Sequence, residues 1–135
     1  MQHKILIVED DQHISEILEI NLSNEGFEVD IAFSAEEAIE KLDDSFHLIL
    51  LDIMMGGMSG YKMAGKLRSE NNHIPIIFLT AKNTENDMLT GFSVGGDDYI
   101  SKPFSIKEVV ARIQALLKRN KAISSALNEE SKLNY

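Results

Sequence analysis

Short apolar segments alternate with longer segments of helical periodicity along most of the chain. Five of the apolar segments predict β-strands, at residues 4–8, 28–33, 47–51, 74–79 and 98–100. The first, third and fourth of these are apolar almost from end to end. That pattern is typical of parallel strands whose two faces are both covered by helices.

The segments between the strands predict helices. One apolar stripe has spacings of three and four residues, at Ile14, Ile17, Leu18 and Leu22. Asp11 precedes this stripe as a candidate N-cap, and Gly26 follows it as a candidate C-terminal glycine. Ser34 and Glu37 form the pattern of a capping box before the next helix. Further helices are expected at about residues 60–68 and 85–94, and from about Ser105 onward.

Strict alternation of strands and helices predicts a doubly wound α/β domain with a parallel sheet. Right-handed crossovers then place helices on both faces of the sheet. The 135 residues are enough for one domain with a sizeable core. We expect that domain to occupy residues 1–120. Residues 121–135 lose apolar density, which predicts the end of a helix running into a polar linker.

Polar residues follow four of the five predicted strands: Glu9, Asp10 and Asp11, then Asp52, then Thr80, and then Lys102. Each has an ordinary structural explanation when it is taken alone, as a helix cap, a turn acid, a strand end or a solvated lysine. In an open parallel sheet, however, the carboxyl ends of the strands share one edge, where ligands bind. Their joint occurrence at this edge favours a functional site over independent coincidences.

The residue types at this edge suit phosphoryl transfer. Clustered carboxylates repel one another, and a hard divalent cation removes the conflict. Mg²⁺ prefers oxygen ligands and leaves coordination positions for water and phosphate oxygens. With Mg²⁺ and Lys102 present, the charges of Glu9, Asp10 and Asp52 are balanced. One carboxylate can then accept a phosphoryl group and become an aspartyl-phosphate.

Charge and composition exclude several other classes of protein. The formal net charge of −9 argues against nucleic-acid binding through the general field of this chain. The chain has no cysteine, so disulfides and thiolate metal sites are excluded. No apolar run approaches the ~20 residues that span a bilayer, and the first apolar segment is too short for a signal peptide. We therefore expect a cytoplasmic protein.

Several motifs resemble those of bacterial response-regulator receiver domains. They are "ILIVEDD", "LILLDIMM" with the following "MSG", "IPIIFLTA", "GGDDYISKPF" and "EVVARI", in the family's order and spacing over about residues 3–119. The last two resemble the OmpR/PhoB type, whose receivers precede a winged-helix DNA-binding domain. The resemblance implies a CheY-like, flavodoxin-like sandwich of three layers, with strand order 2-1-3-4-5 and five helices. It also implies phosphorylation by a sensor histidine kinase.

The resemblance assigns roles around the phosphorylation site. Asp52 would be the phosphoacceptor and a ligand of Mg²⁺. Asp10 would bind Mg²⁺ directly, Glu9 would bind it through water, and Met54 would offer its backbone carbonyl. Such a domain is a signalling module and catalyses only its own phosphorylation and dephosphorylation.

Other residues at the same edge would respond to the phosphoryl group. Thr80 would hydrogen-bond to it, Ala81 would leave space for it, and Lys102 would contact a phosphate oxygen. Tyr99 would turn inward when Thr80 moves. The bond between Lys102 and Pro103 would be cis.

The resemblance further implies a homodimer through the face made by helix 4, strand 5 and helix 5. Its salt bridges would use charged residues of that face, namely Asp97, Asp98, Glu108, Arg112 and Arg119. Three positions depart from the family's usual pattern. Gly56 stands where proline is common, Gly96 stands where alanine is common, and Met88 stands where a basic residue usually faces an acid like Glu108. A weaker or rearranged dimer is therefore expected.

Other functions fit the same fold less well. Aspartyl-phosphate hydrolases typically place an acid two residues after the nucleophile, where this chain has Met54. A flavin-binding domain needs a phosphate-cradling loop after the first strand, and Glu9, Asp10 and Asp11 would repel phosphate there. A degenerate receiver used only for docking would not need the complete set of site residues. A receiver that acts alone through protein–protein contacts is the main alternative to one that controls a DNA-binding domain.

Overall fold

Five parallel strands form a single sheet in the order β2-β1-β3-β4-β5. The computed structural model describes residues 2–81, 89–90 and 93–133, with side chains as far as Arg119. The strands are β1 (Lys4–Val8), β2 (Glu28–Ala32), β3 (Leu48–Asp52), β4 (Ile76–Thr80) and β5 (Asp98–Ser101). The predicted α/β class, the five strands and their order are confirmed.

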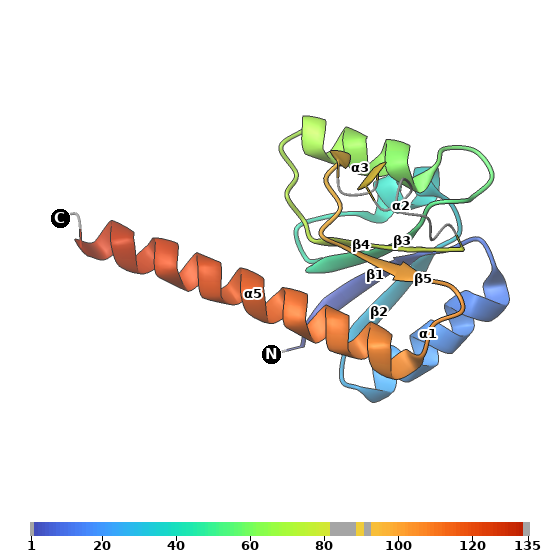
Figure 1. The fold of residues 1–135 in the computed structure, drawn as a ribbon, viewed down its shortest axis with the longest axis horizontal. Coiled ribbons are helices and arrows are strands. Elements are labelled where there is room, and N and C mark those ends of the chain that lie inside the picture. Colours follow the sequence, from blue (N-terminus) through green and yellow to red (C-terminus); the bar gives the residue numbers. More distant parts are fainter. Residues whose placement is uncertain (1, 82–88, 91–92, 134–135) are drawn as a thin grey trace.

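Helices cover both faces of this sheet (Figure 1). They are α1 (Gln12–Asn24), α2 (Ala35–Lys41), α3 (Gly60–Ser69) and α5 (Ile106–Leu133). Helices α1 and α5 lie on one face, and α2 and α3 lie on the other (Figure 1). The helix predicted at residues 85–94, with Met88 in it, falls mostly outside the described residues.

Local capping explains where the helices begin. Asp11 Oδ1 accepts hydrogen bonds from the backbone N–H groups of His13 and Ile14, so Asp11 is the N-cap of α1 as predicted. Ser34 caps α2 by accepting from the N–H of Glu37. The Glu37 carboxylate returns to the N–H of Phe33, one residue earlier than in a standard capping box.

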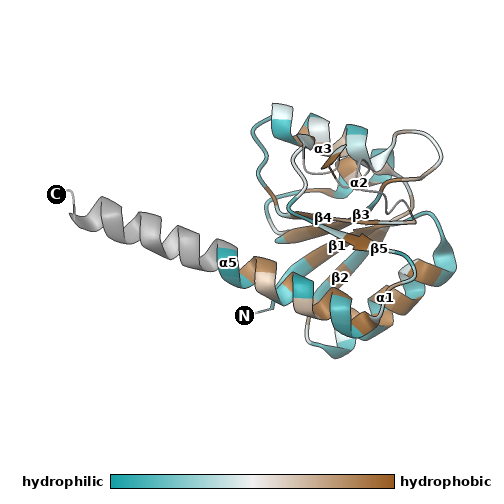
Figure 2. Ribbon diagram, in the orientation of Figure 1, coloured by the Kyte–Doolittle hydropathy of each residue, from teal (hydrophilic) through white to brown (hydrophobic). Residues whose placement is uncertain are grey.

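Alternation along each strand divides the core into two layers. Ile5 and Ile7 of β1 point into the layer under α1 and α5, whereas Leu6 and Val8 point into the layer under α2 and α3. Figure 2 shows apolar residues concentrated in the strands and on the inner faces of the helices. Because both faces of the sheet are buried, its central strands are apolar at nearly every position. This burial leaves the strand ends as the places where polar side chains gather.

Helix α5 is longer than the sequence pattern predicts. It runs for 28 residues, through the segment 121–133 that was expected to leave the helix. The loss of apolar residues after residue 120 predicted the end of the helix there, and that prediction is wrong. A linker role for residues 121–135 stays a prediction. Among the residues that the structure describes, no helix has both the length and the apolar character needed to cross a bilayer.

Candidate phosphorylation and metal site

The strand order brings the four polar strand ends together. Strands β1, β3, β4 and β5 are neighbours in the sheet, whereas β2, which lacks a polar end, lies outside them. Glu9 directly follows β1, and Asp52 and Thr80 are the last residues of β3 and β4. Lys102 directly follows β5, and its backbone N–H donates to the Thr80 carbonyl at 2.8 Å. The structure therefore confirms the prediction that these four strand ends meet at one edge of the sheet.

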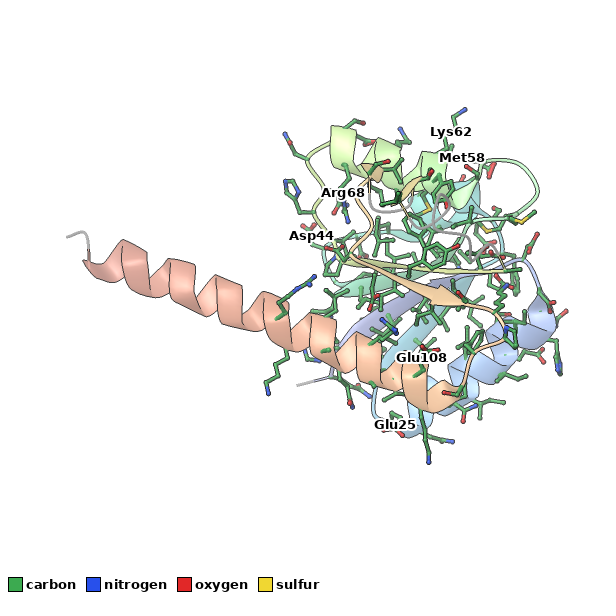
Figure 3. The ribbon with its side chains drawn as sticks, viewed as in Figure 1. Glu25, Asp44, Met58, Lys62, Arg68 and Glu108 are labelled. Atoms are coloured by element: carbon green, nitrogen blue, oxygen red, sulfur yellow. The ribbon has the colours of Figure 1, made fainter. Side chains whose placement is uncertain are left out.

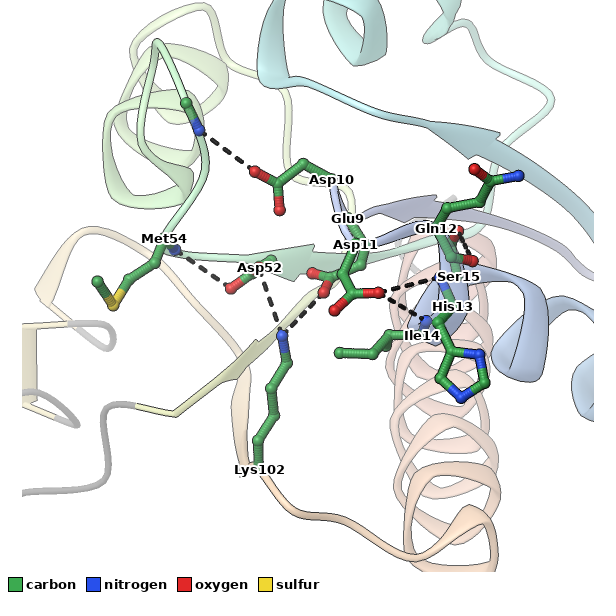
Figure 4. Close-up of polar contacts among 11 residues, drawn as sticks. Glu9, Asp10, Asp11, Gln12, His13, Ile14, Ser15, Asp52, Met54 and Lys102 are labelled. Carbon is green, nitrogen blue, oxygen red and sulfur yellow. Dashed lines mark hydrogen bonds and ion pairs between the residues drawn. The ribbon is translucent and has the colours of Figure 1, made fainter.

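Lys102 lies between two buried carboxylates (Figure 4). Its Nζ is 2.9 Å from Glu9 Oε1 and 3.4 Å from Asp52 Oδ2. Glu9 is 1% exposed and Asp52 is 4% exposed. One ammonium group therefore faces two carboxyl groups from which most water is excluded.

Asp10 completes a cluster of three acids. Ligand oxygens of Glu9, Asp10 and Asp52 lie within 4.8 Å of one another. The loop that follows β3 borders this cluster through its backbone. The Met54 N–H donates to Asp52 Oδ1 at 3.2 Å, and the Gly56 N–H donates to Asp10 Oδ2 at 3.4 Å. Asp11 is occupied as the α1 cap instead, which confirms its ordinary structural role.

The surroundings of Glu9 and Lys102 shift their proton affinities. Burial, reinforced by the nearby Asp52 carboxylate and opposed by Lys102, raises the pKa of Glu9 to about 8. Burial on its own would lower the pKa of Lys102, but the hydrogen bond to Glu9 and the charge of Asp52 outweigh it and raise the pKa. Burial is therefore the main cause of the raised pKa of Glu9, whereas contact with the two carboxyl groups is what raises the pKa of Lys102.

The donor set fits a hard divalent cation. Glu9 Oε2 is buried and accepts no hydrogen bond from any group that the structure describes. A buried carboxylate oxygen without a partner is costly, and a cation or its bound water would satisfy it. Three carboxylates with one exposed member, Asp10, provide oxygen ligands and an opening to solvent. This chemistry matches Mg²⁺, which binds through few carboxylates and keeps several waters.

The other predicted site residues belong to β4 and β5 or to the segments that follow β3, β4 and β5. Thr80 is fully buried at the end of β4, and the exposed Ala81 follows it. Tyr99 is buried in β5 and belongs to the core layer under α2 and α3. The peptide bond between Lys102 and Pro103 is cis, which confirms that prediction. The Met54 side chain points to solvent, so only its backbone borders the site.

The model of the response regulator receiver domain family matches residues 5–114. The chain belongs to this family. Regulatory protein VanR of Enterococcus faecium is 45% identical over 125 residues, which are 92% of this chain and 54% of VanR. The uncharacterized transcriptional regulatory protein YrkP of Bacillus subtilis (strain 168) is 44% identical over 88% of this chain and 51% of its own length. The receiver thus spans about half the length of these curated relatives.

Solved structures support the same assignment. The response regulator DrrB, described as an OmpR/PhoB homologue from Thermotoga maritima, superposes with a TM-score of 0.80 at 29% identity. The match covers 89% of this receiver and 54% of the DrrB chain. Together with VanR and YrkP, DrrB confirms the resemblance to the OmpR/PhoB type.

The charged residues expected at a dimer face form ion pairs within this chain. Arg112 contacts Asp98 at 2.9 Å and Glu108 at 3.4 Å. The hydrogen bond to Asp98, together with the negative charge of Asp98 and Glu108, raises the pKa of Arg112 against the opposing effect of burial. Arg119 lies 3.7 Å from Asp97. Exchange of these contacts across a dimer stays a prediction.

Arg68 was not identified by sequence reasoning, yet it joins α3 to the segment that leads into β5 (Figure 3). Its Nε and Nη2 both donate to the Gly95 carbonyl, at 3.0 and 2.8 Å, and Nη2 also contacts Asp97 at 3.2 Å. Asp97 in turn accepts from the N–H of Ile76 at the start of β4. No local pattern marks the contacts of Arg68 with Gly95 and Asp97, because these partners lie 27 and 29 residues away.

The glycines of the loop after Asp52 have different requirements. Gly57 has a φ of +82°, a left-handed conformation that favours glycine. Gly60, the first residue of α3, packs directly on the backbone of β3. A Cβ there would lie 2.4 Å from the Asp52 carbonyl oxygen and 2.9 Å from the Ile53 Cα. Gly56 has neither restriction, because a Cβ would meet nothing within 4 Å.

Gly60→Ala is therefore expected to destabilise the receiver by about 1–3 kcal/mol, because the new methyl group must displace the backbone of Asp52 and Ile53. Gly65→Ala is the matched control on the same helix. A Cβ at Gly65 meets nothing within 4 Å, and replacing an interior helix glycine should stabilise by about 0.5–1 kcal/mol. Urea denaturation of both variants measures the difference. Equal effects of the two substitutions would contradict the close packing at Gly60.

Proposed function

We propose that this receiver accepts a phosphoryl group on Asp52 from a sensor histidine kinase. The observation that carries the proposal is the meeting of Asp52 with Glu9, Asp10 and Lys102 at one edge of the sheet. The Asp52 carboxylate would attack phosphorus while the bond from phosphorus to the histidine nitrogen breaks. The imidazole nitrogen keeps the bonding electron pair. Positioning and charge stabilisation are the main contributions that a protein makes to such a transfer.

The chain's own residues divide this work. Asp10 and Asp52 would hold Mg²⁺ directly, with Glu9 acting through water and Met54 offering its carbonyl. When bound, Mg²⁺ neutralises negative charge on the carboxylates and on the arriving phosphoryl group. Lys102 would move from its contact with Glu9 to a phosphate oxygen. Thr80 would hydrogen-bond to the phosphoryl group, and Ala81 would leave room for it.

Movement of Thr80 and Tyr99 would then transmit phosphorylation to the face of helix 4, β5 and α5. The charged residues of that face are paired within the chain, so they would have to exchange partners to support a homodimer. The lengths of VanR and YrkP support a second domain in the full protein, and the name of YrkP supports a role in transcription. We propose that the second domain binds DNA and that this receiver controls it.

Incubation with a small phosphodonor tests the phosphoacceptor chemistry without a kinase. In the presence of Mg²⁺, the intact mass should increase by one phosphoryl group per chain. Excess EDTA should prevent the increase, because the carboxylate cluster would then repel the donor. Incorporation that is equally fast with and without EDTA would contradict the Mg²⁺ role, and no incorporation would contradict the proposed function.

A further inference from the structure

Asp10 differs from Glu9 and Asp52 in the groups that contact its carboxylate. Glu9 and Asp52 are buried and share Lys102, whereas Asp10 is exposed and does not contact that lysine. Within the described part of the chain, its one side-chain hydrogen bond comes from the Gly56 N–H, at 3.4 Å. An exposed carboxylate rotates freely unless a partner orients it, and ordering it costs side-chain entropy.

The contact with Gly56 is compatible with metal binding. Asp10 Oδ2 accepts from Gly56, and a carboxylate has a second oxygen and further lone pairs for another ligand. One Asp10 oxygen lies within 4.8 Å of oxygens from Glu9 and Asp52. Figure 4 shows Asp10 reaching from the end of β1 to the backbone of the loop after β3. The hydrogen bond therefore joins the two loops that border the cluster.

What position 56 supplies here is a backbone donor. Gly56 is not in a left-handed conformation, and a Cβ would meet nothing within 4 Å. Neither conformation nor space therefore demands a glycine. Proline, the residue that the family often has at this position, lacks the N–H group and could not make this contact. The departure from the family's pattern thus adds a hydrogen-bond donor next to a candidate metal ligand.

We propose that the Gly56 N–H is a positioning group that orients Asp10 for Mg²⁺. The inference rests on the proposed function, because it needs Asp10 to be a ligand. Groups that hydrogen-bond to metal ligands commonly raise metal affinity by fixing ligand orientation. The contact is long, and hydrogen bonds at such sites often shorten when the ligand binds. Loss of the donor should weaken Mg²⁺ binding by about 2- to 10-fold, the effect of one ordinary hydrogen bond.

Calorimetric titration of Mg²⁺ into the unphosphorylated receiver tests the proposal. Gly56→Ala keeps the N–H and fits the open space, whereas Gly56→Pro removes the N–H. We expect Gly56→Ala to bind Mg²⁺ within about twofold of wild type and Gly56→Pro to bind about 2- to 10-fold more weakly. Binding by Gly56→Pro that equals or exceeds binding by Gly56→Ala would overturn the proposal. No Mg²⁺ binding by the wild-type chain would overturn the proposed function itself.

A second measurement keeps the proposal testable if Gly56→Pro folds poorly. In proton–nitrogen correlation spectra without metal, Asp10→Ala should shift the amide signal of Gly56. The Gly65 amide, inside α3, is the internal reference and should stay in place. An unchanged Gly56 signal would show that the contact does not exist in solution and would overturn the proposal.

Discussion

Asp52→Asn is expected to reduce phosphoryl incorporation to the background of the assay. The amide that replaces the carboxylate has nearly the same shape but is not a competent nucleophile. Asp52 is a buried carboxylate that contacts Lys102, and it ends the central strand β3, which lies between β1 with Glu9 after it and β4 with Thr80 at its end. Intact mass after incubation with a small phosphodonor and Mg²⁺ gives the result directly.

The loss should not come from unfolding. Asp52→Asn removes one of three mutually repelling charges, so stability without Mg²⁺ should stay the same or rise. Asp11→Asn is the matched control, because Asn also caps helices and Asp11 lies at the same edge but serves α1. The control should incorporate phosphate at the wild-type rate. If phosphorylation promotes a dimer, light scattering after incubation with the phosphodonor should show a higher molecular mass for Asp11→Asn and an unchanged mass for Asp52→Asn. Incorporation by Asp52→Asn at the wild-type rate would disprove the assignment.

Without a metal, Lys102→Met is expected to lower the free energy of unfolding more than Asp52→Asn or Gly60→Ala does. Lys102 is 19% exposed and is the cation that contacts the buried carboxylates of Glu9 and Asp52. Methionine retains the apolar stem but leaves these two carboxylates without an ammonium partner. Removing one partner of a buried ion pair typically costs about 3–5 kcal/mol, and the partial exposure of Lys102 places the expected loss at the lower end of that range, at a pH above the value of about 8 at which Glu9 ionises. Urea denaturation in EDTA measures this loss.

Mg²⁺ should partly rescue the same variant. A divalent cation can take over the compensation that Lys102 provides, and it no longer has to compete with the ammonium charge. The gain in stability on adding Mg²⁺ should therefore be larger for Lys102→Met than for wild type. Lys107→Met, at an exposed position of α5, is the control. It should change neither the stability in EDTA nor the gain in stability on adding Mg²⁺ appreciably. Similar stabilities of the two variants in EDTA would refute the role of Lys102 in holding the cluster.

Strand positions and helix starts could be predicted well, because they depend on residues that are close together in the sequence. The alternation of the apolar strands with helical segments indicated the sheet, and Asp11 and Ser34 marked the starts of α1 and α2. These signals are readable because strand burial and helix capping depend on residues within a few positions. The candidate site was predictable for a related reason. Parallel strands must end at a common edge, so the residues that follow them could be grouped from their positions in the chain alone.

Contacts between segments that lie far apart in the sequence could not be predicted in this way. Arg68 looks like an ordinary helix residue, yet it binds the backbone of Gly95. Asp97 contacts Arg68 and Arg119 within the chain, and its predicted role at a dimer face stays a prediction. The length of α5 was also misjudged, because loss of apolar residues ends the buried face of a helix without ending the helix.

The amino-acid sequence by itself determined the order of the elements, the starts of the helices, and which side chains stand at the strand ends. These features follow from backbone preferences and from the period of apolar residues, which act locally. Only the tertiary structure decided that Lys102 faces Glu9 and Asp52, that Glu9 keeps a buried oxygen without a partner, and that Gly56 donates to Asp10. Such contacts join residues 46 to 93 positions apart, so their distances are set by how the sheet and loops pack.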